Sequence, residues 1–573
     1  MTPPPAAPAR PTHRLVADFE RVLGDPLAAG GPFAFAGTVE HEERDELPPG
    51  AVELLREWGL ATCFIPERDG GRLRNLETAF GLTRSLSRRN LTLAVMFGSA
   101  ALGAQPVWLW GDEEQRALVA GGMLAGDLAC FGASEPDHGS DLNANETVAV
   151  ADGEELVLTG EKWPVGNATR GRFVTVLARL EGRGHSLVLV DKERLAEGEW
   201  SHRPFVRPVG LRGHDLSGIV LHGARVPRTH LVGRPGQGLV EVLKTLQITR
   251  TAIGAMSLGT MDSALRIGLD YAHERQLYGG GIYRLPVIRE HLVGAHLDLL
   301  AAECTALPVA RALSVVPSRM SLWSSVVKYL VPVVGEEVTA HVGRVLGARS
   351  YLREGVAGGA FQKLQRDHAV ASIFEGTTHV NLHNIATQLP HVAGFAGTPA
   401  EGADAVLRTL FDWSQEAPVW EPSGRELQLT NASQDEITRG WGPAVAALAR
   451  EAGDRLGADE ARDLARAVAA LDARRTAFYA GVAGQGLDPA STEAARTAAE
   501  HCVYHAAASC VLAWLHNAPG RSGAGWLILV LQRLLQRLDP AARLDYAYVP
   551  QVERVMEECR ASGTYFSVTE FLR

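Results

Sequence analysis

Residues 364–381, LQRDHAVASIFEGTTHVN, place one carboxylate, Glu375, between an apolar Ile-Phe pair and a Gly-Thr-Thr turn. The segment has the pattern of a junction between two helices. One interpretation is an exposed acid that flanks a helix end. The other is a buried general base, because a carboxylate removed from water has a raised pKa and accepts a proton near neutral pH. The rest of the chain must decide between the two.

A second segment with possible chemistry is CFGASEPDHGSD, residues 130–141. Its small residues allow a planar ring or a phosphate to approach the backbone, and the hydroxyls of Ser134 and Ser140 are hydrogen-bond donors. Taken alone, the segment also fits a turn that binds nothing. Its meaning therefore depends on the elements around it.

The elements that position these two segments form four blocks of the chain, which differ in their pattern of apolar residues. After a disordered lead (1–14), helical periodicity runs over 15–125, and short β-rich segments separated by turn residues occupy 126–235. Long amphipathic periods over 236–395 predict a four-helix bundle that carries Glu375, and an Ala-, Arg- and Leu-rich helical extension covers 404–573. The expected fold is mainly α with a β insert, the insert being an antiparallel β-barrel or sandwich.

Composition excludes several classes. The net charge of −10 without a basic tract argues against nucleic acid as a partner. The six cysteines show no CxxC spacing, which argues against zinc and disulfides and favours a reducing compartment, so no metal site is expected. The N-terminus has no apolar signal core and the apolar run near the C-terminus is too amphipathic to span a bilayer. We therefore expect a cytoplasmic protein without a membrane span.

Five segments within about Leu47 to Leu389 form a further pattern. They are LREWGLATCFIPERDGG, the CFGASEPDHGSD loop, GLRGHDLSGIVLHGARVPRTHLVGRPGQGL, DYAHERQLYGG and RDHAVASIFEGTTHV. In sequence and order, these segments resemble the acyl-CoA dehydrogenase family. The resemblance implies an FAD cofactor and α,β-dehydrogenation of an acyl thioester, the β hydrogen leaving as a hydride to flavin N5. It also implies an acceptor similar to the electron-transfer flavoprotein.

Roles for individual residues follow from this resemblance. Glu375 matches the base that removes the α proton, and its backbone N–H is expected to polarise the thioester carbonyl. Substrate contacts are expected at Ser140, Gln247, Thr249, Arg250 and Gly376. Flavin contacts are expected at Phe131, Ser134, Gly139, Ser140, Trp163, Arg275, Tyr278, Arg344, Gly347, Thr377 and His379. The set Arg275, Tyr278, Arg344 and Gly347 matches positions that act across a subunit interface.

The sequence departs from the family where the flavin is expected. EKWPVGNA replaces the usual K-x-W-I-T-N, so that Pro164 and Gly166 take the positions of Trp and Thr, and the Thr hydrogen bond to N5 is lost. Trp163 is the aromatic residue left to swing in. Gln247 stands where an acid commonly meets pantetheine and Thr387 where an Arg often meets the CoA nucleotide, so that a carrier-protein-bound thioester fits as well as acyl-CoA.

In size and helicity the extension resembles that of the very-long-chain branch of the family. In that branch the extension takes the place of the second dimer of the common tetramer. A homodimer is therefore expected. Two other functions stay open. One is a flavin-dependent oxidase or monooxygenase on the same fold, and the other is a relative with an impaired FAD site, suggested by Gly166, Pro286 and the segment GARSY.

Overall fold

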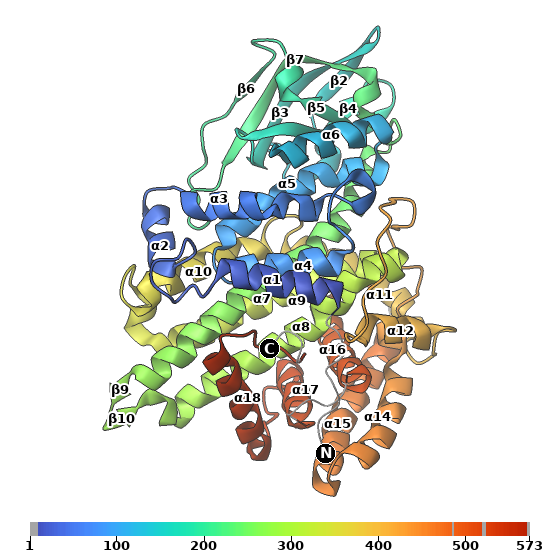
Figure 1. The fold of residues 1–573 in the computed structure, drawn as a ribbon. Coiled ribbons are helices and arrows are strands. Elements are labelled where there is room, and N and C mark those ends of the chain that lie inside the picture. The colour runs from blue at the N-terminus through green and yellow to red at the C-terminus, as the bar shows by residue number, and fades with distance from the viewer. Residues whose placement is uncertain (1–9, 484–485, 518–522, 570–573) are drawn as a thin grey trace.

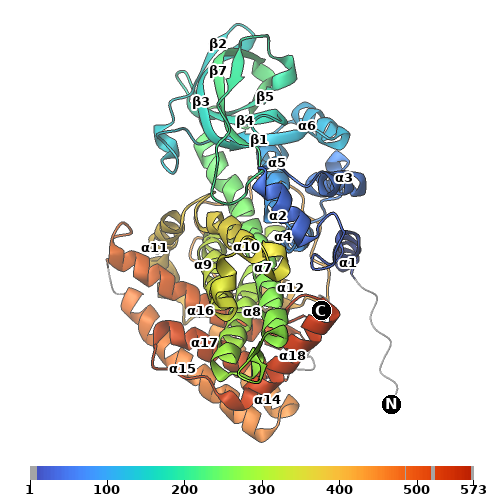
Figure 2. The same ribbon diagram turned by 90° about the vertical axis from the view of Figure 1, so that its left-hand side faces the viewer.

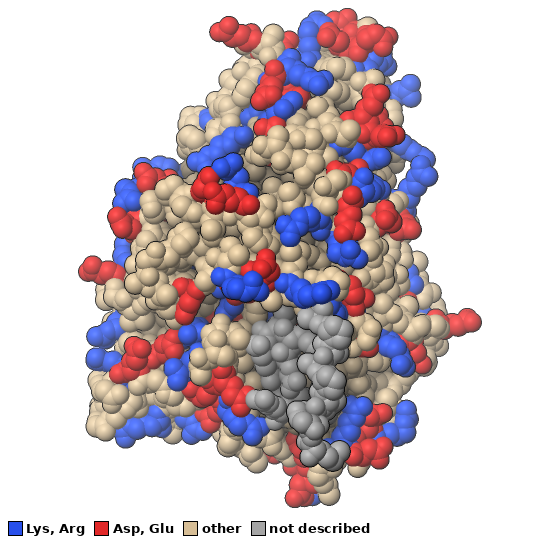
Figure 3. Space-filling model, in the orientation of Figure 1, with Lys and Arg blue, Asp and Glu red and all other residues tan. Residues whose placement is uncertain are grey.

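The structure of the protein is a computed structural model that describes residues 10–483, 486–517 and 523–569. The β domain lies at one end, the helical bundle in the middle and the C-terminal extension at the other end (Figures 1 and 2). On the face shown in Figure 3, acidic and basic side chains are interspersed, without a broad basic surface.

The N-terminal domain consists of helices α1 (Pro11–Leu23), α2 (Phe35–Glu43), α3 (Pro49–Trp58), α4 (Leu76–Ser87), α5 (Leu91–Trp110) and α6 (Glu113–Ala125). Polar N-caps set three of the helix starts. Asn75 accepts from the Thr78 N–H before α4, and Asn90 accepts from the Leu93 N–H before α5. Asp112 forms a capping box before α6.

The expectation of a disordered lead over 1–14 was wrong for residues 11–14, which belong to α1. Residues 1–9 lie outside the described residues, whereas α1 already begins at Pro11, whose fixed φ suits the first turn of a helix. Arg10 forms a buried ion pair with Glu77 at 2.8 Å, and the Thr12 hydroxyl donates to Glu416 at 2.6 Å. These contacts hold the start of α1 against α4 and the segment after α12 (Ala403–Phe411).

The β domain contains strands β1 (Leu128–Gly132), β2 (Val148–Asp152), β3 (Glu155–Gly166), β4 (Gly171–Leu180), β5 (Gly184–Asp191), β6 (Trp200–His202), β7 (Leu216–Pro227) and β8 (Leu231–Val232). Their order is β6-β7-β3-β2-β4-β5-β8, and β1 pairs with β4. The expected fold class, mainly α with a β insert, is confirmed, but the insert is one mixed open sheet and not the expected antiparallel barrel or sandwich. Among the described residues the sheet is open, since its two edge strands, β6 and β8, do not pair with each other. It is mixed, since β1 and β2 both run parallel to β4.

The bundle confirms the expected helical block after the sheet. Its main helices are α7 (Gly238–Glu274), α8 (Pro286–Val315), α9 (Met320–Leu346) and α11 (Thr378–Phe395), with α10 (Ala360–His368) beside them. Helices α7, α8 and α9 pack on one another and α11 packs on α9. A hairpin of β9 (Gln276–Leu277) and β10 (Gly280–Gly281) joins α7 to α8.

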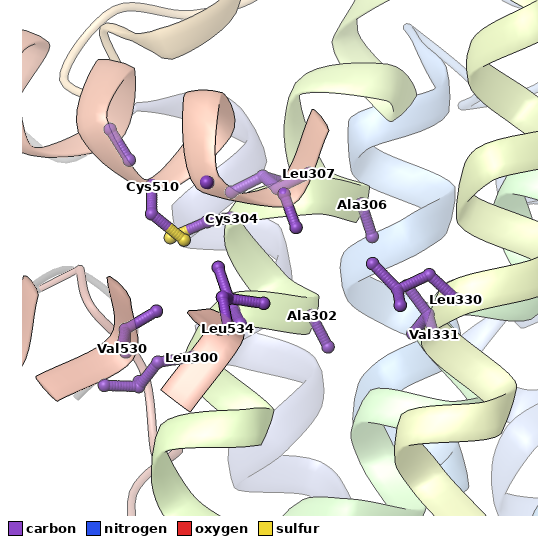
Figure 4. Packing of buried hydrophobic residues seen from close by; sticks show 14 of the residues in the cluster. Leu300, Ala302, Cys304, Ala306, Leu307, Leu330, Val331, Cys510, Val530 and Leu534 are labelled. Atoms are coloured by element: carbon purple, nitrogen blue, oxygen red, sulfur yellow. The ribbon is translucent and has the colours of Figure 1, made fainter. Parts of the chain in front are cut away.

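The extension contains α12 (Ala403–Phe411), α13 (Glu436–Arg439), α14 (Trp441–Arg455), α15 (Ala458–Ala483), α16 (Thr492–His516), α17 (Gly525–Leu538) and α18 (Val549–Ser562). It shares one hydrophobic core with the bundle. Figure 4 shows Leu300 and Cys304 of α8 next to Cys510 of α16 and Val530 and Leu534 of α17. The extension is therefore packed into the protein and is not a loosely attached module.

Helices α5 and α8 are long and apolar enough, by length and composition, to cross a membrane. In α5, 78% of the apolar window is buried inside the protein, and in α8 the whole window is buried. Burial of this kind is that of helices that form a protein core.

Candidate active site

Glu375 lies in the turn between a 3-10 helix (Ala369–Ser372) and α11, and its backbone is left-handed, with φ +54°. Gly376 follows with φ +105°, a conformation that glycine adopts without strain. For a residue with a Cβ the left-handed region costs roughly 1–2 kcal/mol. The surrounding structure must therefore hold this turn, as is typical of functional sites.

Three side chains hold the turn through its carbonyl groups. Arg250 Nε of α7 donates to the Glu375 carbonyl at 3.2 Å. Lys328 Nζ of α9 donates to the Ala371 carbonyl at 2.7 Å and to the Gly376 carbonyl at 3.0 Å. Asn381 Nδ2 also donates to the Gly376 carbonyl, at 2.9 Å. Sequence reasoning identified Arg250 but missed Lys328, whose only signal is a single charge within the apolar stretch of α9.

The Glu375 carboxylate is removed from water. The residue as a whole is half-buried, but its Oε2 is buried and has no hydrogen-bond partner in the described part of the chain. Burial raises the pKa of the Glu375 carboxyl, and the Thr249 hydroxyl, Lys328 and Arg250 oppose this rise without cancelling it. Burial also lowers the pKa of Lys328 to about 8 and that of Arg250 to about 10, so both stay cationic at neutral pH. A carboxylate that is buried and has a raised pKa, as Glu375 does, has the properties of a general base.

A cavity of ≈ 50 Å³ lies beside Glu375. Its wall comes mainly from α4, α5 and α7 and is mostly apolar, with Leu76 and Met256 as examples. Trp420 also lines it, from the segment that joins α12 to α13, and sequence reasoning missed this residue. The backbone N–H of Trp420 donates to the Arg74 carbonyl at 2.6 Å, and this bond fixes the segment beside the cavity. Such a space suits an aliphatic chain that ends near the carboxylate.

The expected flavin-facing residues of the β domain lie along the 130–141 loop and on the neighbouring strand β3. The Trp163 N–H donates to the Ser134 carbonyl at 3.0 Å, so β3 and the loop are joined there. Buried Lys162 ties the same loop through Glu135, at 2.8 Å. The remaining members of this group are Phe131, half-buried on β1, and the exposed Gly139 and Ser140.

The departure at Gly166 has a steric cause. A Cβ at this position would lie 2.6 Å from Ser99 Oγ and 2.9 Å from His214 Nε2, so that a threonine does not fit without movement of these groups. Ser99 follows Gly98, which lines the cavity beside Glu375. The end of β3 therefore reaches α5 next to the cavity, and a hydroxyl and an imidazole occupy the space of the missing side chain. Neither Ser99 nor His214 was identified from the sequence.

Residues expected to contact flavin across subunits lie elsewhere. Arg275 caps the end of α7, and at about 1.5 Å per residue it lies roughly 37 Å along this helix from Arg250. Tyr278 is next to it in the hairpin, 84% exposed. Arg344 and Gly347 lie at the end of α9, and the neighbouring Arg349 contacts Tyr271 of α7. One chain therefore does not bring this group to Glu375.

Three further expected residues have ordinary structural surroundings. Thr377 is the N-cap of α11 and accepts from the Val380 N–H at 3.3 Å, whereas His379 is exposed on the first turn. Gln247 is buried, and its Nε2 donates to the Gln428 carbonyl of the α12–α13 segment at 2.7 Å. Its amide is thus engaged by the extension.

The arrangement agrees with the comparison with known proteins. Models of the N-terminal, middle and C-terminal domains of acyl-CoA dehydrogenase match residues 36–127, 130–224 and 236–389. Because these matches together cover well over half of the chain, the protein belongs to the acyl-CoA dehydrogenase family. It is an FAD-dependent oxidoreductase that acts on the CH–CH group of acyl thioesters.

Individual relatives are distant. The chain is 27% identical over 367 residues to the mitochondrial short-chain specific acyl-CoA dehydrogenase of Bos taurus, which covers 62% of this chain and 86% of that protein. An acyl-CoA dehydrogenase from Bacillus anthracis, solved with FAD, aligns with a TM-score of 0.62 at 20% identity over 97% of this chain and 96% of its own. A prolyl acyl carrier protein oxidase aligns with a TM-score of 0.58 at 19% identity over 65% of this chain and 97% of its own. The alignment with the Bacillus protein shows that the fold of the extension also has a counterpart.

The residues present fit FAD. Gly139 has open space around its Cα, and the half-buried Trp163 stands beside the small-residue loop, as a planar ring requires. At the other end of the bundle, Arg275 and Arg344 are cations suited to a pyrophosphate.

Proposed function

We propose that the protein introduces a double bond between the α and β carbons of an acyl thioester, with Glu375 removing the α proton. The observation that carries this proposal is the Glu375 carboxylate itself. Its Oε2 is buried without a partner in the described structure, its pKa is raised, and it stands beside an apolar cavity.

The chemistry requires this environment because the α proton of a thioester is weakly acidic. A base acts on it only when it is desolvated and held against the α carbon. Arg250 and Lys328 supply the positioning through the carbonyls of the turn, and the Glu375 N–H is proposed to polarise the thioester carbonyl. When bound, FAD supplies the hydride acceptor for the β hydrogen.

The cavity supports an acyl chain as the group that lies beside Glu375. The carrier of the thioester is either CoA or a carrier protein. Gln247, which stands where the family commonly has an acid for pantetheine, donates one amide hydrogen to the Gln428 carbonyl, and its Oε1 has no partner in the described structure. This contact favours neither carrier by itself, and titration with both thioesters distinguishes them.

We further propose a homodimer in which each flavin site takes Arg275 and Tyr278 from the second copy. The support is the distance of roughly 37 Å along α7 between Arg250 and Arg275, which one chain cannot close. The exposed Tyr278 and Tyr351 near this end of the bundle supply apolar surface for the contact. Sedimentation equilibrium of the FAD-loaded protein tests the dimer, and a monomer that holds FAD tightly would contradict it.

The test of the base is Glu375→Gln in anaerobic titration with acyl-CoA and acyl-carrier thioesters. We expect flavin bleaching to slow by about 10²–10⁴-fold, the contribution of general base catalysis, while FAD stays bound. The matched control is Glu336→Gln, because Glu336 is an exposed acid that accepts the Ser372 hydroxyl beside the same turn. Bleaching of the Glu375→Gln protein at the wild-type rate would refute the assignment.

A second candidate function is an oxidase, in which oxygen and not a flavoprotein reoxidises the flavin. The observation that favours it is the altered surface at Gly166, where Ser99 and His214 take the place of the usual threonine. Mixing the bleached protein with air-saturated buffer tests this candidate. Reoxidation within a catalytic turnover supports the oxidase, and persistence of the reduced flavin supports a protein acceptor.

A further inference from the structure

Two histidines and one aspartate come together inside the extension, outside the site of Glu375. Asp435 precedes α13, and His501 and His505 lie on α16. All three are fully buried, each with a relative exposure of 0%. One potential ligand atom from each lies within 4.8 Å of those of the other two. Because residues four apart on a helix share a face, both imidazoles point to the same side of α16.

The hydrogen bonds of this cluster leave the facing atoms without partners. Asp435 Oδ1 accepts from Trp323 Nε1 at 2.9 Å and from the Thr438 N–H at 3.1 Å, whereas Oδ2 has no partner. His501 Nδ1 pairs with the Tyr479 hydroxyl at 2.9 Å, whereas its Nε2 has none. Neither ring nitrogen of His505 has a hydrogen-bond partner in the described structure. Buried polar atoms are rarely left in this way, and each such atom calls for a ligand or a water.

The donor set is that of a divalent metal ion. Two imidazole nitrogens and one carboxylate oxygen are ligands that Zn²⁺ accepts readily. The outer contacts are also those of a metal site, because Tyr479 fixes the ring of His501 and the Trp323 and Thr438 N–H groups fix the carboxylate. Ligand atoms around a tetrahedral zinc lie about 3.4 Å apart, so donors that lie within 4.8 Å of one another must move closer together to bind the ion.

We propose that Asp435, His501 and His505 bind a divalent transition-metal cation such as Zn²⁺ at a structural site. Four helical segments meet at the site, because Trp323 belongs to α9 of the bundle and Tyr479 to α15, while Asp435 is the N-cap of α13 and both histidines lie on α16. The cation thereby links the start of α13 to α16 within the extension, and the hydrogen bond from Trp323 to Asp435 connects the site to the bundle. This site is independent of the flavin chemistry.

The competing interpretation is a metal-free cluster in which the imidazoles and the carboxylate share protons. Elemental analysis separates the two. Untagged protein is stripped with a chelator, dialysed against Zn²⁺ and passed through a desalting column before the metal is measured. We expect about one zinc ion per chain in the wild type. Wild-type protein that retains no zinc overturns the proposal.

The variants locate the ion. The His505→Gln and Asp435→Asn proteins should each retain at least tenfold less zinc per chain than the wild type. His516→Gln, on the last turn of the same helix, should retain as much zinc as the wild type. Retention that is equal in all variants overturns the proposal. Addition of Co²⁺ to the stripped wild type gives a readout that needs no variant, because a visible absorption band of a four-coordinate ion with nitrogen ligands should appear. Its absence counts against the site.

Discussion

Replacement of Lys328 by Met tests how the Glu375 turn is held. Lys328 is 1% exposed, and its ammonium group donates to the carbonyls of Ala371 and Gly376. In the variant the Gly376 carbonyl keeps the Asn381 donor, but the Ala371 carbonyl loses the Lys328 donor. A buried acceptor left unpaired costs about 1–3 kcal/mol. Removal of a buried charge offsets part of this cost, so we expect a fall of only a few degrees in Tm.

The effect on the reaction should be larger than the effect on stability. A shift of about 1 Å in a catalytic group lowers the rate roughly 10²-fold, so anaerobic bleaching in Lys328→Met should slow by about 10–100-fold. The pH profile gives a second readout. Lys328 lowers the pKa of Glu375, and the base acts only when it is ionised. Loss of this charge therefore raises the pKa, and the acidic limb of the rate profile moves to higher pH.

Lys192→Met is the matched control, because Lys192 is also a buried lysine that donates to a backbone carbonyl, that of Ala168, but lies in the β domain. It should lose stability to a similar degree without a shift of the pH profile. If Lys328→Met bleaches at the wild-type rate with an unchanged acidic limb, Lys328 does not position Glu375 and the reasoning fails.

Two further changes test the cavity and the core. Trp420→Ala should enlarge the cavity beside Glu375, so kcat/KM should rise for longer acyl chains relative to shorter ones, by about fourfold for each additional methylene that fits. An unchanged preference in a series of chain lengths would place the acyl group elsewhere. Arg84→Met should lower the free energy of unfolding by about 3–5 kcal/mol in chemical denaturation, because it leaves Asp262 and Glu303 buried without their partner. Arg466→Met, whose side chain is 71% exposed, should change it by less than about 1 kcal/mol, and equal losses would argue against the buried network.

The order of helical and β-rich blocks could be predicted because both periodicities are local. A helix repeats its apolar face every three to four residues and a strand every second residue, so each block is recognisable without its neighbours. Sheet closure is not local. Whether β6 meets β8 depends on strands that are far apart in the chain, and the pairing of β1 with β4 is parallel although most other neighbours are antiparallel. The alternating pattern cannot distinguish these cases.

The site could be predicted where it matches family segments. Glu375 lies in such a segment, and Thr249 and Arg250 lie between two of them. In the structure Thr249 lines the cavity beside Glu375, and Arg250 donates to the Glu375 carbonyl. Lys328 was missed because a lysine in a helix usually reaches solvent, and only the tertiary packing shows that this one is buried. Trp420 was missed because it belongs to a segment beyond the family match.

The proposed zinc site was missed for a different reason. No metal was expected because the cysteines lacked zinc spacing, whereas the ligands proposed here contain no cysteine. His501 and His505 have the spacing of one helix face, but this spacing is common in buried helices that bind no metal. Asp435 is remote from them in the chain, so its approach depends on the packing of the extension.

The extension and the active site are connected through particular residues. Trp323 and Lys328 belong to the same helix, α9, where Trp323 bonds to Asp435 of the extension and Lys328 holds the Glu375 turn. The segment between α12 and α13 adds Trp420 to the cavity wall and binds Gln247 of α7 through its backbone. A change in how the extension packs therefore reaches both the position of Glu375 and the shape of the cavity beside it. The specificity of this enzyme should depend on residues that lie outside the part it shares with its shorter relatives.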